Sequence, residues 1–384
     1  MSCPNCQGPS KFQDRRDKTF VSLMGQIVLQ RRAYYHCPAC HAGHVPLDAA
    51  LGFSACKLTP AAEELVSLAG TLDSFADAAQ KALPKMAGLR LSESTVERTT
   101  EAAGERLGDL WAQGRTLGTA TDWHWNRDAQ GKTIAYVSID ATGVGMQGQG
   151  GTRTEGRMAW VGKVFNPRPE SNSDRQPKSF APSARYQAGL MNLDELGARL
   201  RAQAGQVGME RAEQWVALTD GGNGLDDFME VNFPRAVRVL DFYHAAEHLN
   251  DFAKIYCGSD LKTAEELSNE WCHQLKHQGG GALLETLYAL NLRGRTDAIR
   301  EAHRRTTLYV WNNLHRTDYP YYREQGWQIG SGHIEAACKT IVNQRLKQSG
   351  MRWGTDGADA VCHLRALYEG EDSQWDAFWA RSIN

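Results

Sequence analysis

The chain has 384 residues, of which 41% are hydrophobic and 23% are charged, and its formal net charge is -2. This length exceeds one ordinary hydrophobic core and predicts a globular protein of two to four domains. The small net charge excludes a uniformly basic nucleic-acid coat, although local basic clusters remain. No apolar run reaches the length of a membrane span, and the N-terminus does not resemble a signal peptide. We therefore expect a cytoplasmic protein that has no membrane partner.

Two Cys-x-x-Cys pairs stand near the N-terminus, Cys3 with Cys6 and Cys37 with Cys40. Nine cysteines are too few for a disulfide scaffold at this length, whereas four thiolates in two such pairs form a closed tetrahedral site for structural Zn²⁺. Alternating residues between the pairs predict a two-stranded hairpin. Residues 1–50 are therefore expected to form a zinc ribbon that either reads DNA or stiffens the N-terminus. A redox dithiol pair and four unrelated thiols are the alternatives.

Residues 51–115 have the periodicity of helices. Helices are predicted over residues 61–72, 75–83 and 92–111. Ser92 or Ser94 would cap the last helix, and Glu97 would complete a capping box with Ser94. Two helices joined by a short connection are compatible with helix-turn-helix DNA binding, but helical hairpins that touch no DNA show the same pattern. The polar segment over residues 114–131 is expected to be a linker.

Two apolar runs indicate the catalytic core, and each brings an aspartate to the end of a predicted strand. Residues 136–144 carry Asp140 towards their C-terminal end, and residues 215–219 are followed directly by Asp220. Far downstream, Glu335 lies at the start of a helical pattern. Hard divalent cations such as Mg²⁺ prefer oxygen ligands and assist chemistry on phosphates. We therefore predict that these three carboxylates meet in a metal site.

The order of elements around these runs predicts the fold. Strands are expected over residues 136–144, 156–165, 184–188, 215–219 and 236–240, and helices over 193–201 and 225–231. This is the order of ribonuclease-H-like α/β folds, in which catalytic groups gather where strands end. Residues 143–148 also match the Gly-x-Gly-x-x-Gly dinucleotide fingerprint. A strand follows where that fingerprint requires a helix, so we interpret the segment as a hairpin tip.

Asp241 follows the fifth strand, with His244, Glu247 and His248 close behind it. His-x-x-Glu-His places two imidazoles on one helical face, as in inverted zinc proteases that use the glutamate as a base. Alternatively, Asp241 and His244 assist the carboxylate site, where His244 would hydrogen-bond a phosphate or transfer a proton. A third interpretation makes both histidines ordinary, partly buried residues at the start of a helix.

Residues 245–327 are almost wholly helical in pattern and are expected to form an all-helical insertion. Breaks are predicted at Gly258, at residues 279–281 and at Gly294. The tryptophans of this insertion are either core residues or stacking surfaces for a displaced base.

Residues 328–384 are expected to rejoin residues 130–244 in the catalytic domain. In the helix that begins near Glu335, Lys339 and Arg345 would be cations that hold phosphate. An ordinary amphipathic surface helix would show the same pattern.

Four segments together resemble the DDE transposases of bacterial insertion sequences, in particular the branch with an N-terminal zinc ribbon that is related to Mutator-like transposases. They are residues 138–143, 219–221, 241–249 and 330–335. The resemblance implies that Asp140, Asp220 and Glu335 are a catalytic triad that binds two Mg²⁺ or Mn²⁺ ions. It also implies that Asp241 and His244 are an accessory pair.

The family implies cleavage of DNA at terminal inverted repeats and joining of the freed 3′ ends to target DNA by a homodimer or larger oligomer in the nucleoid. The expected fold is α/β: a ribonuclease-H-like catalytic core with an all-α insertion, preceded by a zinc ribbon and a helical domain. Two other classes stay open. One is a zinc-dependent hydrolase that uses His244, Glu247 and His248, and the other is a catalytically silent DNA-binding protein.

Overall fold

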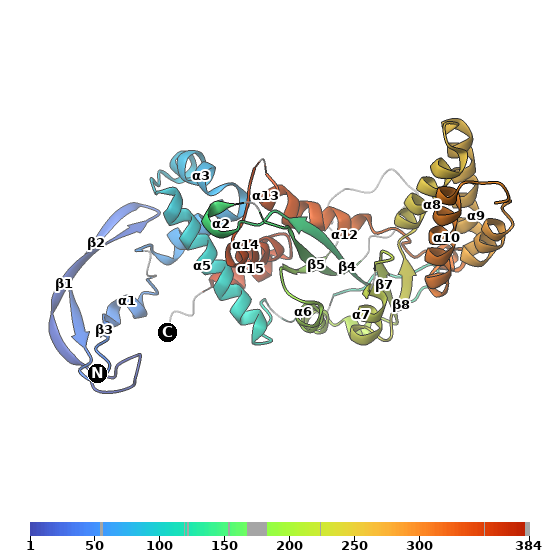
Figure 1. Ribbon diagram of the computed structural model, residues 1–384. Helices are drawn as coiled ribbons and strands as arrows, with labels where there is room; N and C mark the ends of the chain where they lie inside the picture. Colours follow the sequence, from blue (N-terminus) through green and yellow to red (C-terminus); the bar gives the residue numbers. More distant parts are fainter. Residues whose placement is uncertain are drawn as a thin grey trace.

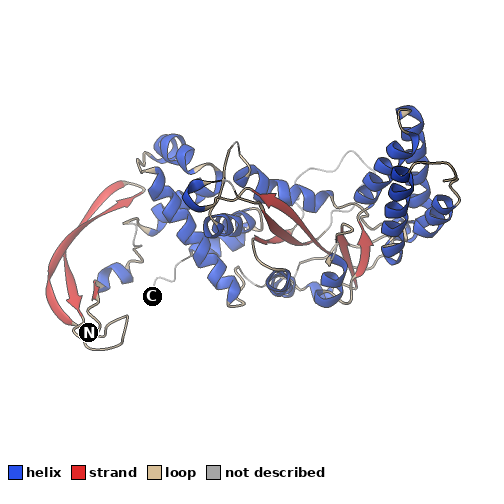
Figure 2. Ribbon diagram, in the orientation of Figure 1, coloured by secondary structure: helices blue, strands red, loops and turns tan. Residues whose placement is uncertain are grey.

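The computed structural model describes residues 1–53, 57–118, 120, 123–152, 154–166, 183–222, 224–348 and 350–380. The molecule is elongated, with a β-ribbon at one end, a central sheet, and a helical lobe at the other end (Figure 1). Its strands lie in the ribbon and in the centre, and helices surround the central strands (Figure 2). Among the described residues, no helix combines the length and the apolar character needed to cross a membrane.

The ribbon is a long antiparallel hairpin at the N-terminus. It consists of β1 (Lys11–Ser22) and β2 (Gly25–His36), to which the short β3 (Gly43–His44) adds a third strand. The hairpin turns at Gly25, whose φ of 106° is rarely adopted by residues other than glycine. The predicted hairpin is therefore confirmed, and its first strand begins seven residues earlier than Lys18, where alternation first becomes clear.

The central sheet has five strands in the order β6-β5-β4-β7-β8. They are β4 (Ile134–Val144), β5 (Arg157–Phe165), β6 (Ala184–Gly189), β7 (Gln214–Thr219) and β8 (Val237–Leu240). β5 is antiparallel to both of its neighbours, so the other four strands run in one direction. The parallel connections pass through α6 (Leu193–Gln206) and α7 (Leu225–Asn232). All five predicted strands and both predicted helices are present.

The two faces of the sheet are covered by different helices. Successive residues of a strand point to opposite faces. On β4, Val137 and Ile139 pack in the core that contains α6 and α7, whereas Tyr136 packs in the core of the helical lobe. Asp140 therefore faces the side covered by α12 (Gly332–Ala337).

The helices before the sheet are α2 (Pro60–Leu72), a continuous run of α3 (Phe75–Asp77), η1 (Ala78–Ala82) and α4 (Leu83–Ala87), and α5 (Glu93–Ala112). The Ser92 hydroxyl caps α5 by accepting a hydrogen bond from the Thr95 N–H at 3.2 Å. Ser94 lies inside the helix, so its predicted capping box with Glu97 does not form. Short elements elsewhere are α1 (Pro46–Ala50), η2 (Gln149–Gly151) and η3 (Met209–Arg211).

α5 belongs to the same core as the C-terminal helices. It crosses α14 (Thr355–Tyr368), and Ala103 and Trp111 of α5 pack in one buried cluster with Val361 of α14. The segment predicted as a linker also contributes to the interior, because Trp123 and Trp125 are buried against α6. This part of the chain is therefore packed against the sheet domain and is not a free linker.

The helical lobe consists of α8 (Phe242–Cys257), α9 (Leu261–Tyr288), α10 (Asp297–Asn312), η4 (Leu314–Arg316) and α11 (Tyr319–Glu324). The chain breaks near Gly258 and Gly294 as predicted, whereas Gly279, with a φ of 84°, kinks α9 without ending it. Trp271 is buried and stacks on Phe252 with ring centroids 5.3 Å apart. Trp311 is 59% exposed.

The chain returns to the sheet through α12, which continues into η5 (Cys338–Asn343) and α13 (Gln344–Leu346). Ile334, Ala337 and Ile341 form a buried apolar stripe on this helical segment. α14 and α15 (Asp372–Trp379) then complete the core, in which Trp353, Trp375 and Trp379 are buried.

The crossing of α5 and α14 depends on the absence of a side chain at Gly104. A Cβ atom there would lie 2.1 Å from the Ala360 carbonyl oxygen, whereas one at Gly281, within α9, would have no neighbour within 4 Å. We expect Gly104→Ala to lower the free energy of unfolding by about 1–3 kcal/mol because the helices must separate. Gly281→Ala should leave it unchanged or raise it by up to about 1 kcal/mol. Urea unfolding followed by tryptophan fluorescence measures both, and equal losses would contradict this account.

Candidate functional site

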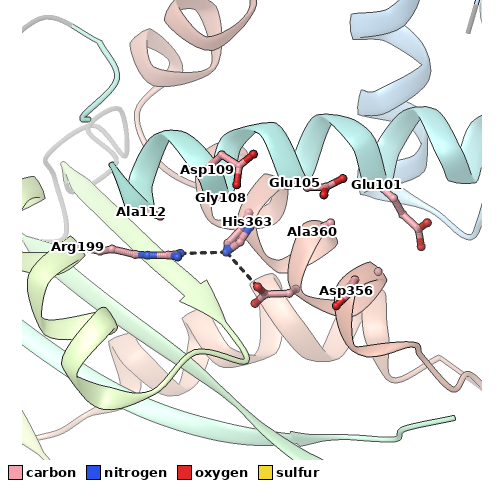
Figure 3. A pocket seen from close by; sticks show the side chains of 11 residues that line it. Glu101, Glu105, Gly108, Asp109, Ala112, Arg199, Asp356, Ala360 and His363 are labelled. Atoms are coloured by element: carbon pink, nitrogen blue, oxygen red, sulfur yellow. Dashed lines mark hydrogen bonds and ion pairs between the residues drawn. The ribbon is translucent and has the colours of Figure 1, made fainter. Parts of the chain in front are cut away.

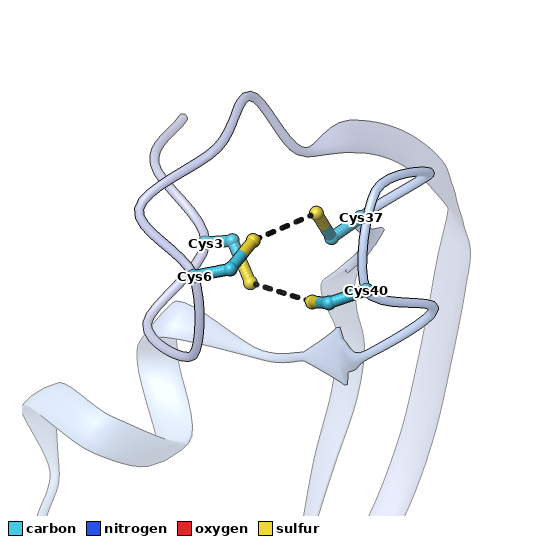
Figure 4. Close-up of side chains that lie close together, drawn as sticks. All are labelled: Cys3, Cys6, Cys37 and Cys40. Carbon is cyan, nitrogen blue, oxygen red and sulfur yellow. Dashed lines mark hydrogen bonds between the residues drawn. The ribbon is translucent and has the colours of Figure 1, made fainter.

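Four cysteine thiols converge at the base of the β-ribbon (Figure 4). The sulfur atoms of Cys3 and Cys40 are 3.6 Å apart, those of Cys6 and Cys37 are 3.5 Å apart, and all four lie within 4.8 Å of one another. A tetrahedral zinc ion with Zn–S bonds of about 2.3 Å requires sulfur atoms about 3.8 Å apart. The cluster therefore fits zinc.

The backbone wraps each cysteine pair in the same kind of turn. The Cys3 carbonyl accepts a hydrogen bond from the Gln7 N–H at 3.0 Å, and the Cys37 carbonyl accepts one from the His41 N–H at 2.9 Å. Gln7 and His41 share a φ of 60°. Hydrogen bonds from backbone N–H groups, with that of Cys6 the strongest, lower the pKa of Cys3 to about 6, and similar bonds lower the pKa of Cys37. The turns thus favour the thiolate forms of Cys3 and Cys37, which are the forms that bind metal. A hydrogen bond from the Gly8 backbone lowers the pKa of Cys6, but the Cys40 and Cys37 thiols outweigh it and raise that pKa to about 12.

If these thiolates hold a structural zinc ion, the purified protein should contain one zinc per chain. We expect Cys37→Ser to abolish that zinc and to unfold the base of the ribbon, because a structural site contributes directly to folding. Cys272→Ser, which changes a thiol in α9, should keep the metal. Elemental analysis and limited proteolysis of residues 1–50 measure both effects. Full zinc content in the Cys37 variant would refute the assignment.

The three predicted carboxylates come from three neighbouring elements. Asp140 lies in β4, and Asp220 directly follows β7. These strands are parallel neighbours, and their register pairs Ser138 with Leu218, so Asp140 and Asp220 reach the same level of the sheet. Glu335 lies on α12, which covers that face.

Electrostatics indicate that the three carboxylates share one region. Burial raises the pKa of Asp140, and repulsion from Asp220 and Glu335 raises it further. Salt screens such repulsion between exposed charges beyond about 10 Å. Among the described residues, however, the cysteine cluster is the one group of three or more potential ligands that all lie within 4.8 Å. The three carboxylates therefore influence one another electrostatically without forming such a close group.

Ser331 connects Glu335 to Asp241. The Ser331 hydroxyl lies 2.9 Å from a Glu335 carboxylate oxygen and 2.6 Å from an Asp241 carboxylate oxygen. Asp241 also accepts hydrogen bonds from the backbone N–H groups of Ser331, Tyr243 and His244, and it is 1% exposed. Its carboxylate is therefore fully used in capping α8 and holding Ser331. Any part it has in the chemistry is to position Glu335.

His244 and His248 lie one turn apart on α8. Their ring centroids are 5.0 Å apart, and His248 stacks on Tyr309 at 4.0 Å. Burial, with a contribution from His244, lowers the pKa of His248. No group of three ligands among the described residues includes either histidine. The arrangement therefore lacks the third ligand that a zinc-dependent hydrolase needs.

Two residues near Asp220 escape the sequence analysis. The Tyr309 ring lies against Gly221, where a Cβ atom would come within 2.3 Å of it, and its hydroxyl is buried with no hydrogen-bond partner among the residues that the structure describes. Burial raises the pKa of Tyr309, and Asp220 adds to the rise. Arg316 is 1% exposed and donates to the Thr219 hydroxyl at 2.9 Å and to the Asp220 carbonyl at 3.2 Å. The two glycines after Asp220 are the sole sequence signal of this close approach.

The prediction that Arg345 holds phosphate is wrong. Arg345 is 1% exposed, donates to the Gly70 carbonyl at 2.9 Å, and stacks on the rings of Phe75 and Trp353. It therefore fastens the N-terminal helices to the core. A different cation faces the carboxylate side of the sheet: the Lys347 ammonium donates to the Thr142 hydroxyl at 2.6 Å, two residues after Asp140.

A separate cavity of about 350 Å³ lies between α5, α14 and Arg199 of α6 (Figure 3). Its lining includes five carboxylates, and His363 forms its floor, 3.1 Å from Arg199 and 3.6 Å from Asp359. These contacts are internal to the packing of the two helices. The cavity includes none of the predicted site residues.

Comparison with known proteins adds no relative from which a role could be transferred. No protein-family model matches the chain, and no curated protein sequence matches it significantly. The functional argument therefore depends on the residues and their geometry.

Replacing each of two aspartates of this site by asparagine should have different effects on the free energy of unfolding. Asp241→Asn replaces an acceptor of four hydrogen bonds by a group that also carries donors, so we expect a loss of about 2–3 kcal/mol in the free energy of unfolding. Asp140→Asn removes a desolvated charge that its neighbours repel, so that variant should be at least as stable as the natural chain. Urea unfolding without divalent cations measures both. A destabilised Asp140 variant would contradict the electrostatic account.

Proposed function

We propose that this protein is a DDE transposase that cleaves DNA at the terminal inverted repeats of its element and joins the 3′ ends to target DNA. The observation that carries the proposal is that Asp140 and Asp220 stand at one level of neighbouring parallel strands, while Glu335 lies on a helix that covers the same face and follows an all-helical insertion. The sheet, in which the second strand alone runs in the opposite direction, supports a ribonuclease-H-like core. In such folds, strand ends carry the chemistry.

Asp140, Asp220 and Glu335 would hold two Mg²⁺ or Mn²⁺ ions. All three donate oxygen, and the raised pKa of Asp140 reflects burial together with repulsion that divalent cations would relieve. When bound, such ions supply charge neutralisation and an activated water or 3′-hydroxyl for attack on a phosphodiester. The donor set therefore fits the cofactor.

The residues around the triad hold its members in place. Asp241 and Ser331 hold the Glu335 carboxylate at the end of β8, while Arg316 fixes the backbone of Asp220. The buried Tyr309 hydroxyl beside Gly221 is available to a phosphate oxygen, and His244 lies on the same helix face as His248, which stacks on Tyr309. These groups would orient the strand, and the carboxylates would hold the reacting centre.

DNA binding is assigned to the ribbon and the helices that follow it. Lys11, Arg15, Arg16 and Arg31 are exposed on the ribbon, and basic β-ribbons are one of the forms that enter DNA grooves. A homodimer or larger oligomer would bring two element ends together. Two alternatives remain testable. A zinc-dependent hydrolase would require His244, Glu247 and His248, and a silent DNA-binding protein would bind the ends without nicking them.

The test is Mg²⁺-dependent nicking of a DNA fragment that carries the element's own end. We expect Asp140→Asn, Asp220→Asn and Glu335→Gln each to lower the nicking rate about 10³-fold, equivalent to about 4 kcal/mol in the activation barrier. Glu247→Gln should retain activity, because its carboxylate lies on the exposed side of α8. Loss of activity in the Glu247 variant alone would favour the hydrolase. Binding without any nicking by the natural chain would favour the silent protein.

A further inference from the structure

A pocket of about 640 Å³ opens beside α12, between the helical lobe and the segment over residues 326–333. Its wall includes Tyr243 from α8, Lys276 from α9, Arg323 from α11 and His333 from α12. The proposed chemistry uses none of these side chains. The pocket is therefore a separate feature that the carboxylate site does not explain.

The charged side chains that line the pocket are all basic. Lys276 and Arg323 contribute two permanent cations, His333 adds an imidazole, and no carboxylate is part of the lining. Neither Lys276 nor Arg323 forms an ion pair among the described residues; Lys276 lies over the Phe242 ring at 5.5 Å, and Arg323 contacts His277 at 3.1 Å. Unpaired cations around a concave surface focus a positive potential that attracts anions.

A buried lysine of the central sheet adds to the positive potential of the pocket. Lys163 is 3% exposed on β5, and no hydrogen bond or ion pair involves its ammonium in the described part of the chain. Its Nζ atom lies 4.6 Å from the centre of the Phe165 ring, which in turn lies 5.4 Å from the His333 ring. Burial lowers the pKa of Lys163 to about 8. A buried lysine without an anion is costly, and an anion bound nearby would offset that cost.

The absence of side chains keeps the pocket open. A Cβ atom on Gly330 would lie 2.4 Å from the Tyr243 ring, so only glycine lets the chain pass this close to α8. Gly332, also in the lining, has no neighbour within 4 Å of the position of a Cβ atom.

The pocket is close to the carboxylates along α12. His333 precedes Glu335 by two residues, and Ser331, which contacts Glu335, lies between the lining residues Gly330 and Gly332. The pocket therefore opens beside the helical turn that carries Glu335. A DNA strand carries one phosphate about every 3.4 Å of its axis, so a strand that lies along this turn presents more than one phosphate to it.

We propose that this pocket binds a phosphodiester of the DNA strand, one or two linkages from the bond that is cut, with Lys276 and Arg323 as its ligands. The inference rests on the proposed function, because it takes DNA as the source of the phosphate. The pocket fixes the position of the strand relative to Glu335 and so determines which linkage reaches the metal site.

The experiment compares two double variants of the full chain. Lys276→Gln with Arg323→Gln empties the pocket of permanent cations. Lys254→Gln with Lys262→Gln removes the same charge from α8 and α9 of the same helical lobe, away from the pocket, where both lysines pair with nearby carboxylates. Fluorescence anisotropy measures the binding of a labelled DNA duplex at several NaCl concentrations. No Mg²⁺ and no chelator are added, so the DNA stays intact and bound zinc is retained.

We expect the pocket variant to bind DNA at least tenfold more weakly in low salt. Its plot of log affinity against log salt should lose about 1 unit of slope, because one phosphate is no longer neutralised. The control variant should change affinity less than about threefold. Equal behaviour of the two variants at unchanged thermal stability would overturn the proposal.

Two further measurements distinguish DNA from free phosphate as the ligand of the pocket, and distinguish the pocket from the proposed nicking activity. Titration calorimetry with inorganic phosphate tests the pocket alone. The assignment to DNA would be overturned if the natural chain binds phosphate but no DNA and the pocket variant binds no phosphate. Nicking is assayed in parallel with Asp140→Asn. If the natural chain binds DNA through the pocket but never nicks it, the proposed enzyme fails while the phosphodiester pocket stands.

Discussion

The site depends on one buried carboxylate, that of Asp241. A buried charge is tolerated only when it is fully hydrogen-bonded, and Asp241 accepts bonds from the start of α8 and from Ser331, which is 90 residues away in sequence. Its own backbone N–H donates to the Thr219 carbonyl at 2.8 Å. The chain therefore leaves the sheet at Asp241, directly after β8, and returns to it at Ser331, which is hydrogen-bonded to the same residue. Because Ser331 contacts Glu335 as well, satisfying Asp241 fixes the start of the helix that carries the third carboxylate.

The carboxylates themselves are held together against their charge. Strand register fixes Asp140 and Asp220 on adjacent strands, and the raised pKa of Asp140, caused first by burial, is the electrostatic consequence. Glu335 is exposed and precedes the π-helical turn of η5. Such turns occur often at functional sites. The sheet thus supplies two rigid ligand positions, and the third position lies on a helix whose local geometry is less regular.

Local patterns in the sequence predict the strands, the ribbon and the cysteine cluster, because each depends on spacing over a few residues. An apolar, β-branched run predicted β4 to within two residues of its start at Ile134, and the hairpin between the two Cys-x-x-Cys turns brings them together. Long-range packing was not predictable in this way. Arg345 has the spacing of a phosphate ligand, yet the rings of Phe75 and Trp353 bury it. Gly104, four residues before Gly108, was the sole local hint that α5 crosses another helix closely. The pattern of one helix does not show which surface it covers.

The helical insertion is part of the site rather than an appendage to the sheet. Tyr309 reaches Gly221 from α10, and Arg316 from η4 donates hydrogen bonds to the Thr219 hydroxyl and to the Asp220 carbonyl. The same lobe contributes Lys276 and Arg323 to the pocket beside α12. The sheet and α12 therefore carry the acidic groups, and the insertion contributes the hydroxyl beside Gly221 and the cations of the neighbouring pocket. Under the proposed function, a DNA strand would lie along the boundary between lobe and sheet, where both sets of groups are present.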